Sequence, residues 1–472
     1  MHRLRALDKD VAIAARTMTV SRISAPLILL AAVGLLLHLF QISSPTSPVF
    51  DEAHFATYSA DYVAGIPFED IHPPFGKWIY ASVLKLYPPS AIQGATFVAA
   101  IRMADGLLHM ETPKSSYGNF PYVALRIVDS VFGVLLALAL YFFMRSLDIG
   151  RVGSVLAAFF VTLDNAILLN TRLILLDGMF LFFGIAALAL YFGFGNISKT
   201  RRSTIAGLVF GLSLAVKLTG IVFMGPTLIA LLIARKGERK VEWQNLWRFL
   251  LVGLIVLTAV WLAGTFAFST SARLTALSQI TPKYIPSLAW QTQHPLESYF
   301  VADLLELRFS LRSYTLGPLE YGYSSPWYMW PLDQKAMPFG SGLVLQGNPV
   351  TWFASTLAVL IALIAAIVFL IRKRWNVVRD AFVKYRSPVI MLGGYLFAML
   401  PFVTIIHRDT FLYHYFPALL FAFGLLAWII SEWLGVREWT DFTQRTAGIF
   451  CIVVALVIAG FLIMMPGTYG FM

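Results

Sequence analysis

The sequence predicts an all-α polytopic membrane protein. Of its 472 residues, 58% are hydrophobic and only 13% are charged, and the mean hydropathy is +0.73. Soluble domains average about 45–50% apolar and about 25% charged residues, so this composition excludes an ordinary soluble enzyme. Long apolar runs recur along the chain, most of them near the roughly 20 residues that one helical crossing requires. The single cysteine, Cys451, excludes internal disulfides and cysteine-based metal clusters.

Nine apolar runs each predict one membrane-spanning helix. A tenth stretch, 203–234, is long for one helix, and basic clusters flank it on both sides. Because basic clusters stay on the cytoplasmic side, the chain has to cross an even number of times between them. We therefore expect two short helices, 204–216 and 218–234, with a turn at Lys217, and about eleven spans in all. The other nine expected spans are 24–42, 121–144, 152–168, 173–194, 246–268, 350–371, 388–406, 411–431 and 446–465.

The distribution of charge predicts the orientation of the chain. The formal net charge is +11, which in a soluble protein would suggest a nucleic-acid partner but in a membrane protein marks the cytoplasmic side. With eleven spans, the loops that fall on one side hold 23 of the 36 Lys and Arg residues. We therefore expect a cytoplasmic N-terminus with residues 1–22 as a tail, a C-terminus outside, and no nucleic-acid partner.

Two long segments are expected on the outer side, 43–120 and 269–349. The first contains two apolar stretches, 75–87 and 95–110, that are too short to cross and suit helices lying in the membrane interface. The inner loops are short by comparison. We therefore expect an active site that faces outward.

Two adjacent carboxylates, Asp51 and Glu52, open the first outer segment. A helix N-cap explains them locally, because 53–63 looks helical. A general base at the membrane surface explains them as well, and the two interpretations are compatible. About twenty residues later, His72 begins a His-Pro-Pro sequence that predicts a rigid turn before an interfacial helix.

Further ionisable residues lie near the outer ends of several expected spans. Charge at such depth is costly, so these residues should face a cavity or pair with one another. Arg172 could pair with Asp164 or Asp177. Clustered aromatic side chains in the second outer segment, Trp327 and Trp330 among them, are typical of an interfacial belt. Four cationic or ionisable residues on the outer side predict a phosphate site: Arg126, Lys217, Arg408 and His414.

Taken in order along the chain, eight short motifs resemble those of the protein O-mannosyltransferases. The first outer segment carries two of them, Phe50 to Phe55 (FDEAHF) and Asp70 to Lys77 (DIHPPFGK). Ala53 and Gly178 depart from the family's usual residues. Six further matches follow in the same order: Leu125-Arg126, Arg172 to Asp177, Ser213 to Gly220, Ser325 to Leu332, Gly347 to Trp352, and Phe411 to Ala418.

The resemblance implies a GT-C glycosyltransferase fold over residues 23–472. It implies transfer of mannose from dolichyl or polyprenyl phosphate to Ser or Thr hydroxyls of exported proteins, with inversion at the anomeric carbon. Asp51 would be the base, and Glu52 and His72 would orient Asp51 or the acceptor. No cofactor is required, although the acidic pair could hold a divalent metal. Six residues would position substrate or support the site: Arg172, Asp177, Trp327, Trp330, Asn348 and Tyr413.

The resemblance also suggests where such a protein works. The segment 269–349 has no room for the MIR domain of eukaryotic members, which favours a prokaryotic plasma membrane over the endoplasmic reticulum. Association as a dimer or with a translocon is compatible with the sequence. Two alternatives stay open: a transferase for another lipid-linked sugar or for a glycan or lipid acceptor, and a lipid or solute transporter. Clustering of the charged residues at one face favours an enzyme over a transporter.

Overall fold

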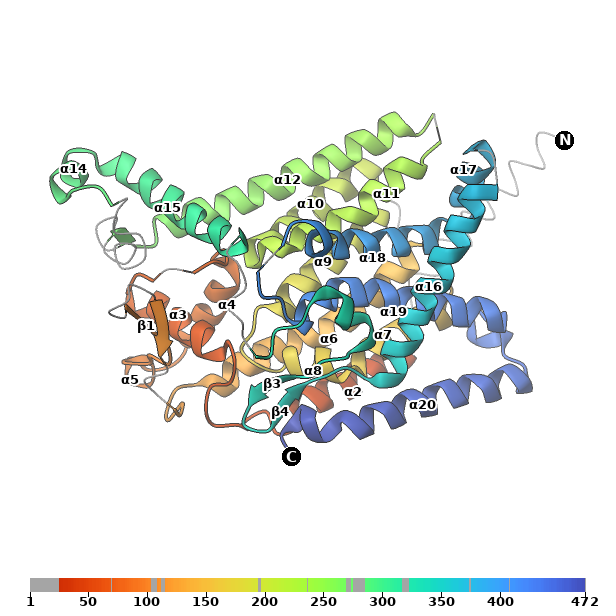
Figure 1. Ribbon diagram of the computed structural model, residues 1–472, viewed down its shortest axis with the longest axis horizontal. Helices are drawn as coiled ribbons and strands as arrows, with labels where there is room; N and C mark the ends of the chain where they lie inside the picture. The colour runs from red at the N-terminus through yellow and green to blue at the C-terminus, as the bar shows by residue number, and fades with distance from the viewer. Residues whose placement is uncertain are drawn as a thin grey trace.

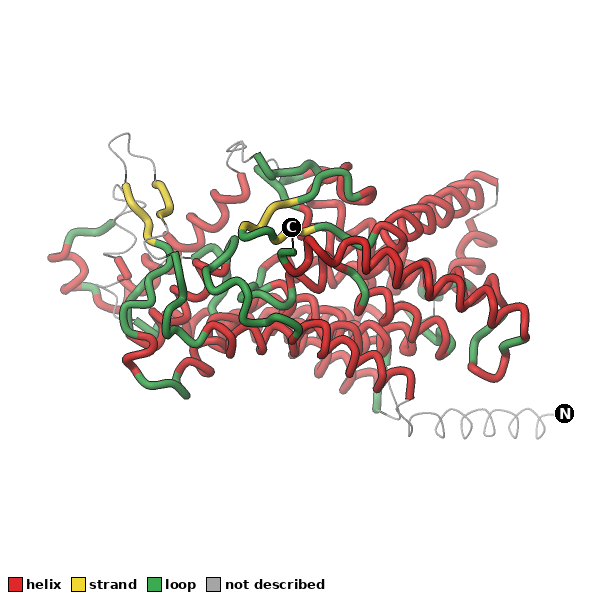
Figure 2. The backbone as a smooth tube through the Cα atoms, turned by 90° about the horizontal axis from the view of Figure 1, so that it is seen from below, coloured by secondary structure: helices red, strands yellow, loops and turns green. Residues whose placement is uncertain are grey.

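The computed structural model describes most of the chain as a bundle of helices (Figure 1). The expected cytoplasmic tail, 1–22, lies outside the described residues. Figure 2 shows that strands and loops gather over one half of the molecule, whereas helices run toward the other end. The described residues are 25–68, 70–102, 108–111, 115–193, 197–235, 237–268, 273–274, 285–315, 322–372, 375–406 and 408–471.

Six helical stretches in the described part are long and apolar enough to cross a membrane. Shorter apolar helices accompany them, so the prediction of a polytopic helical protein is confirmed, while the count of eleven spans stays a prediction. The long helices are α6 (Tyr122–Ser146), α12 (Arg239–Thr265), α16 (Pro349–Arg372), α18 (Arg386–Thr404), α19 (Phe416–Leu434) and α20 (Gln444–Tyr469). The shorter ones are α2 (Ala25–Leu39), α7 (Arg151–Thr162), α9 (Asp177–Phe192), α10 (Lys199–Val216) and α11 (Gly225–Ile233).

The predicted break at Lys217 is confirmed. Helix α10 ends at Val216, Lys217 is extended (φ −142°, ψ 131°), and the 3₁₀ helix η1 (Leu218–Met224) leads into α11. Figure 1 shows α11 and α12 joined at the right-hand end of the bundle. The chain therefore turns back at Lys217, which leaves this side chain at the opposite end.

The first outer segment is helical only in part. It forms α3 (Glu52–Ala64), α4 (Phe75–Leu84) and α5 (Pro89–Ile92), which confirms the short helix expected within 75–87. The helix expected over 95–110 is wrong, because β1 (Ala99–Arg102) and β2 (Leu108–Glu111) pair there as antiparallel strands. A short apolar run does not distinguish strand from helix, and the Asp-Gly sequence between these strands is typical of a hairpin connection.

The remaining short elements cover the ends of the long helices. The second outer segment contains α14 (Leu288–Gln293), α15 (Pro295–Thr315), the 3₁₀ helix η3 (Trp327–Leu332), and the antiparallel strands β3 (Met337–Gly340) and β4 (Leu343–Leu345). Elsewhere lie α8 (Asn165–Asn170), α17 (Trp375–Lys384), and the 3₁₀ helices η4 (Leu412–Tyr415) and η5 (Trp439–Asp441).

Helix α19 forms the centre of the bundle. It packs against α7, α16 and α18, and every residue from Phe416 to Ala427 is buried. Such an all-round apolar helix is typical of a position enclosed by other helices. The 3₁₀ helix η4 precedes it directly, so the packing of α19 fixes the position of His414.

The loops that the charge pattern assigns to one side lie together. Residues from the α6–α7, α11–α12 and α17–α18 connections line one shared cavity of about 640 Å³. In Figure 1 these connections lie at the right, away from α3, α4 and β1 at the left. One end of the bundle is therefore rich in basic residues, and the other carries the acidic motif.

Candidate active site

Asp51 lies immediately before α3. Phe50 holds the backbone in an uncommon left-handed conformation (φ 49°), and its ring stacks on Phe339 at 4.6 Å between centroids and meets Tyr413 at 5.8 Å. Asp51 occupies the N-cap position of α3, but its side chain accepts no capping hydrogen bond. The N-cap interpretation is therefore wrong for the carboxylate, which the helix leaves available for chemistry.

The surroundings of Asp51 suit a base. Burial raises the pKa of the Asp51 carboxyl above its ordinary value, while the charges of His54 and Lys217 oppose this and those of Asp177 and Asp70 add to it. A carboxylate whose pKa is raised toward neutrality accepts a proton more readily. The ring of Tyr413 links this region to Lys217, because it lies 5.8 Å from that of the neighbouring Phe50 and 5.5 Å from the Lys217 ammonium.

Glu52 and Arg126 form an ion pair that is fully buried, with neither side chain exposed. Arg126 donates from Nη2 and Nε to the two carboxylate oxygens at 2.7 and 2.8 Å. Glu52 also accepts from the backbone N–H groups of Val49 at 3.2 Å and Ile174 at 3.0 Å. The pair therefore ties the acidic motif to α6 and to the turn before α9.

The remaining guanidinium nitrogen of Arg126 is also engaged within the protein. Its Nη1 donates to the carbonyl oxygens of Ile42 at 3.1 Å and Pro45 at 2.9 Å. A phosphate could reach Arg126 only by displacing these partners. The structure thus favours a positioning role for Arg126 over the phosphate contact expected from the sequence.

The His-Pro-Pro turn is fixed by two residues to which the sequence gave no role, Asp70 and Lys77. The buried Lys77 ammonium donates to the Asp70 carboxylate at 2.5 Å and to the carbonyl oxygens of His72 and Pro73 at 2.7 and 3.2 Å. Burial alone would raise the pKa of Asp70, but the charge and hydrogen bond of Lys77 outweigh it and hold the pKa below its ordinary value. The sequence contained one signal for this contact, namely two opposite charges seven residues apart on either side of a Pro-Pro turn.

His72 is therefore held in a defined position and is uncharged near neutral pH. Burial, together with the charges of Lys217, Lys77 and Arg408, lowers the pKa of His72 to about 3 against the opposing charge of Asp70. Two of the predicted phosphate ligands, Lys217 and Arg408, thus contribute to the electrostatic field at the His-Pro-Pro turn.

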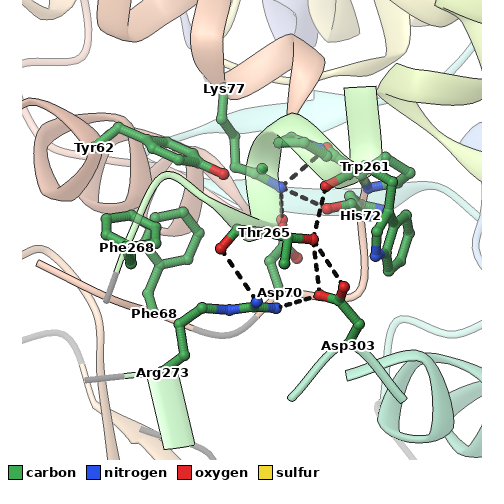
Figure 3. Close-up of a pocket in the computed structure, with 13 residues that line it drawn as sticks. Tyr62, Phe68, Asp70, His72, Lys77, Trp261, Thr265, Phe268, Arg273 and Asp303 are labelled. Atoms are coloured by element: carbon green, nitrogen blue, oxygen red, sulfur yellow. Dashed lines mark hydrogen bonds and ion pairs between the residues drawn. The ribbon is translucent and has the colours of Figure 1, made fainter. Parts of the chain in front are cut away.

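The second outer segment closes over the same turn. Figure 3 shows Lys77 and His72 across a small cavity from Arg273 and Asp303. Arg273 donates from Nη2 to Asp303 at 2.8 Å, and the hydroxyl of Thr265 donates to the same carboxylate. No sequence motif joins residues thirty positions apart in an irregular segment, so this contact could not have been predicted.

Lys217 lies at the break between α10 and η1, where it is buried. Its ammonium donates to both oxygens of Asp177 at 3.0 and 2.9 Å, and it lies 5.5 Å above the ring of Tyr413. Asp177 is the first residue of α9, where the positive end of the helix favours a carboxylate. Lys217, Asp177 and Tyr413 therefore converge from three separate segments.

His414 presents one nitrogen to the same region. His414 Nδ1 lies 3.0 Å from both the backbone N–H and the carbonyl oxygen of Phe411, so it accepts from the first or donates to the second according to the tautomer, and Nε2 stays available to a ligand. The ring stacks between Tyr413, at 4.5 Å, and the buried Trp330, at 6.1 Å. Trp330 is held in turn by donating to the backbone carbonyl and hydroxyl of Ser325.

Arg172 and Asn348 lie in supporting structure. Arg172 donates to the carbonyl oxygen of Phe40 at 2.5 Å and lies over the ring of Tyr469 at 4.4 Å. The expected ion pair of Arg172 with Asp164 or Asp177 is wrong for the described residues. Asp177 pairs with Lys217 instead, and Asp164 accepts from backbone and indole N–H groups.

Asn348 lies next to Asp164 in a polar network beneath the outer segments. Its side chain donates to the carbonyl oxygens of Leu163 and Val457 at 3.0 and 2.9 Å. Trp327 lies in η3 with 37% of its surface exposed, as expected of an interfacial belt. Neither residue contacts the carboxylate of Asp51 in the described structure.

A shared metal site of Asp51 and Glu52 has little support in the geometry. Both oxygens of Glu52 already accept from Arg126. In the described part of the chain, no group of three or more His, Cys, Asp and Glu side chains has an arrangement that could hold a metal ion. The cluster around Asp51 instead combines one available carboxylate with cations and N–H donors.

Comparison with known families covers almost the whole chain. Residues 28–275 match the model described as dolichyl-phosphate-mannose-protein mannosyltransferase, and residues 300–472 match the one described as the C-terminal four-transmembrane region of protein-O-mannosyltransferase.

Curated relatives match over shorter stretches. The chain is 28% identical over 227 residues to dolichyl-phosphate-mannose–protein mannosyltransferase 5 of Saccharomyces cerevisiae, covering 48% of this chain and 26% of the relative. It is 27% identical over 202 residues to protein O-mannosyltransferase 1 of Drosophila pseudoobscura, covering 42% and 20%. The matched stretch thus spans between a fifth and about a quarter of the length of these relatives.

Solved structures show the fold over nearly the full chain. The S. cerevisiae protein O-mannosyltransferase Pmt1-Pmt2 complex bound to the sugar donor superposes with a TM-score of 0.76 at 15% identity, covering 97% of this chain and 92% of that one. The apo oligosaccharyltransferase of Archaeoglobus fulgidus gives a TM-score of 0.55 at 15% identity, covering 94% and 56%. The fold is that of GT-C glycosyltransferases, which by itself does not define the reaction.

Proposed function

This chain belongs to the dolichyl-phosphate-mannose–protein mannosyltransferase family, and we propose that it transfers mannose from a polyprenyl or dolichyl phosphate to Ser or Thr hydroxyls of exported proteins. One observation carries the proposal. The Asp51 carboxylate makes no helix-capping bond, and the neighbouring Phe50 contacts Tyr413, whose ring lies against both the Lys217 ammonium and His414. A base on one side and cations on the other suit displacement of a phosphate by a hydroxyl.

The reaction proposed is a single displacement. The acceptor oxygen forms a bond to the anomeric carbon while the bond from that carbon to the phosphate oxygen breaks, so the configuration inverts. Asp51 takes the hydroxyl proton late, as that bond breaks, because a carboxylate cannot deprotonate an alcohol outright. Such positioned proton transfer contributes about 10²–10⁴-fold to the rate. The lipid phosphate leaves as an anion, and no metal is required.

The leaving phosphate is stabilised by Lys217, Arg408 and His414 in this proposal. An ammonium group has three N–H donors, and Asp177 accepts two of those of Lys217. The third is suited to a phosphate oxygen, as is Nε2 of His414 in the tautomer that accepts at Nδ1 from Phe411. Charge-assisted contacts to phosphate are the strong ones, and they strengthen as charge develops on the leaving group.

Glu52 and Arg126 act on Asp51 through the backbone. Since Glu52 is the next residue, its buried ion pair fixes where the Asp51 carboxylate can lie. The His-Pro-Pro turn, held by Lys77, bounds the same space. In the proposal these residues position the base, and substrate contact is left to Asp51 and the cations.

The end of the bundle that carries Asp51 is proposed to face away from the cytoplasm, because basic residues concentrate at the other end. This orientation would place the acceptor among proteins that have crossed the membrane. Association with a second copy or with a translocon fits the proposal, since the S. cerevisiae relative is itself a complex of two chains.

The function is tested by supplying different donors to the protein reconstituted in liposomes. Polyprenyl-phosphate mannose, glucose and arabinose, each radiolabelled, are offered with a Ser/Thr-rich peptide. We expect label to enter the peptide from the mannose donor alone. Transfer from another sugar, or transfer of mannose to lipid or glycan instead of peptide, would replace the proposal with the open alternative. Absence of transfer from every donor would favour a transporter.

The phosphate site is tested by Lys217→Ala and Arg408→Ala. Each is expected to weaken donor binding about tenfold to a hundredfold, because a hydrogen bond to a charged group contributes about 1.5–3 kcal/mol. Binding of a fluorescent polyprenyl-phosphate mannose is measured by equilibrium titration. Lys85→Ala, which removes an exposed cation at the end of α4, is the matched control. Unchanged affinity in both variants would overturn the phosphate site.

A further inference from the structure

The cavity of about 640 Å³ at the basic end of the bundle plays no part in the proposed reaction. It lies where α6, α11, α12 and α19 meet the ends of α17 and α18, and Figure 1 places these helix ends far from the acidic motif near α3. None of the residues that line it belongs to the candidate active site. Its chemistry therefore calls for a separate explanation.

Two of the four acidic residues that line this cavity pair with cations that also line it. Lys199 pairs with Glu242 at 2.9 Å, and Arg437 pairs with Glu432 at 3.2 Å. Arg437 also donates to the carbonyl oxygen of Asp148 at 2.6 Å. These contacts join the connections between helices, and the cavity lining as a whole holds five Lys and Arg residues against four Asp and Glu residues.

Three further cations line the cavity without such pairing: Arg235, Lys384 and Arg386. Among the side chains that the structure describes, none forms an ion pair with any of the three, and Glu238 is the one lining Glu with no ion pair described. Lys384 lies 5.3 Å above the ring of Tyr385, and Arg386 lies 5.5 Å above that of Phe192. The two side chains thus rest on aromatic rings, and no ion pair is described for either of them.

The sequence around α17 adds to this excess of positive charge. The segment 372–387 contains six Lys and Arg residues and one acidic residue, Asp380. It joins two long apolar helices, α16 and α18, so it lies directly at a membrane boundary. Basic clusters next to a membrane span, and basic pockets between spans, are typical sites for anionic lipid headgroups.

Exposed tryptophans place the cavity at the level of the headgroups. Trp243 and Trp247, on the first turns of α12, are 56% and 58% exposed, and Trp433 at the end of α19 is 72% exposed. Exposed indole rings concentrate where acyl chains meet headgroups. A lipid is therefore a better-placed source of phosphate for this cavity than a solute from bulk water.

We propose that this cavity binds the phosphate group of an anionic phospholipid, with Arg235, Lys384 and Arg386 as its charge partners. The phosphate diester lies among the three cations, and the acyl chains follow the apolar outer faces of α11 and α12, where Leu232 and Leu251 are exposed. The site is independent of the proposed transferase reaction. It would couple the packing of α17 and α18 to the lipid composition of the leaflet.

The test is direct lipid binding to the purified full-length protein. Dioleoylphosphatidylglycerol is titrated into detergent-solubilised protein and retained lipid is counted by native mass spectrometry, with dioleoylphosphatidylcholine and inorganic phosphate in separate arms. We expect preferential retention of the anionic lipid, weakened by salt. The triple variant Arg235→Gln, Lys384→Gln, Arg386→Gln should bind it about fivefold more weakly for each cation removed.

A second triple variant controls for net charge. Arg201→Gln, Lys240→Gln and Arg445→Gln remove three exposed cations at the same end that do not line the cavity, and retention should stay at the wild-type level. Equal losses in both triple variants, or no loss in either, would overturn the proposal. So would displacement of the lipid by millimolar inorganic phosphate. If the first triple variant does not fold, Arg235→Gln alone, on an exposed side chain, decides the question.

Discussion

Asp51→Asn is expected to lower the rate of mannose transfer about 10²–10⁴-fold while leaving donor affinity near the wild-type value. Asparagine has the shape of aspartate but accepts no proton at neutral pH, and the phosphate contacts lie on other residues. Because burial raises the pKa of Asp51, its ionised form is lost on acidification at a higher pH than for an ordinary carboxyl. The acid limb of the wild-type pH–rate profile should therefore lie above about pH 4.

Asp61→Asn is the matched control for this substitution. Asp61 lies on the same helix, α3, and burial raises its pKa to about 7, but it makes no described contact with the cluster around Lys217. Its replacement should leave transfer close to wild type. Wild-type turnover in Asp51→Asn would show that another group, or none, acts as the base.

Glu52→Gln and Arg126→Met should each destabilise the protein by about 3–5 kcal/mol, because removing one partner leaves the other as an uncompensated buried charge. Neither side chain has exposed surface, and the pair joins segments 74 positions apart in the sequence. Unfolding in detergent, followed by circular dichroism against denaturant, measures the loss. The double variant should lose less than the sum of the two single variants.

Glu438→Gln serves as the comparison for an ion pair at the surface. Glu438 lies 3.5 Å from Arg151, and its side chain is 40% exposed. Such pairs contribute about 0–1 kcal/mol, since solvent screens them. If Glu52→Gln and Arg126→Met cost no more than Glu438→Gln, the buried pair does not hold the acidic motif in place.

Hydropathy and charge were sufficient to predict the helical architecture. The break at Lys217 followed from basic clusters on both sides of 203–234, and α3 and α4 followed from local pattern. The strands β1 and β2 were missed, because a short apolar run carries no information that separates strand from interfacial helix. Hydropathy therefore predicts long apolar helices better than it predicts the secondary structure of the segments between them.

The site was predictable as a set of residues but not as a set of contacts. The sequence placed Arg126, Lys217 and Arg408 on one side and near one depth. Whether such a cation faces a ligand or a carboxylate depends on packing between segments far apart in the chain. Glu52 and two backbone carbonyl groups engage all three nitrogens of Arg126, whereas Asp177 accepts only two hydrogen bonds from the Lys217 ammonium. Only the three-dimensional structure could separate these two cases.

The account's central claim is a single displacement in which mannose passes from a lipid phosphate to a hydroxyl activated by Asp51. The most direct measurement is the anomeric configuration of mannose on the peptide product of the reconstituted protein, read from one-bond carbon–proton couplings by nuclear magnetic resonance. With a β-linked donor, the account predicts an α-mannosyl product. A β-mannosyl product would mean two displacements and a covalent intermediate, and would contradict the role of Asp51 as base.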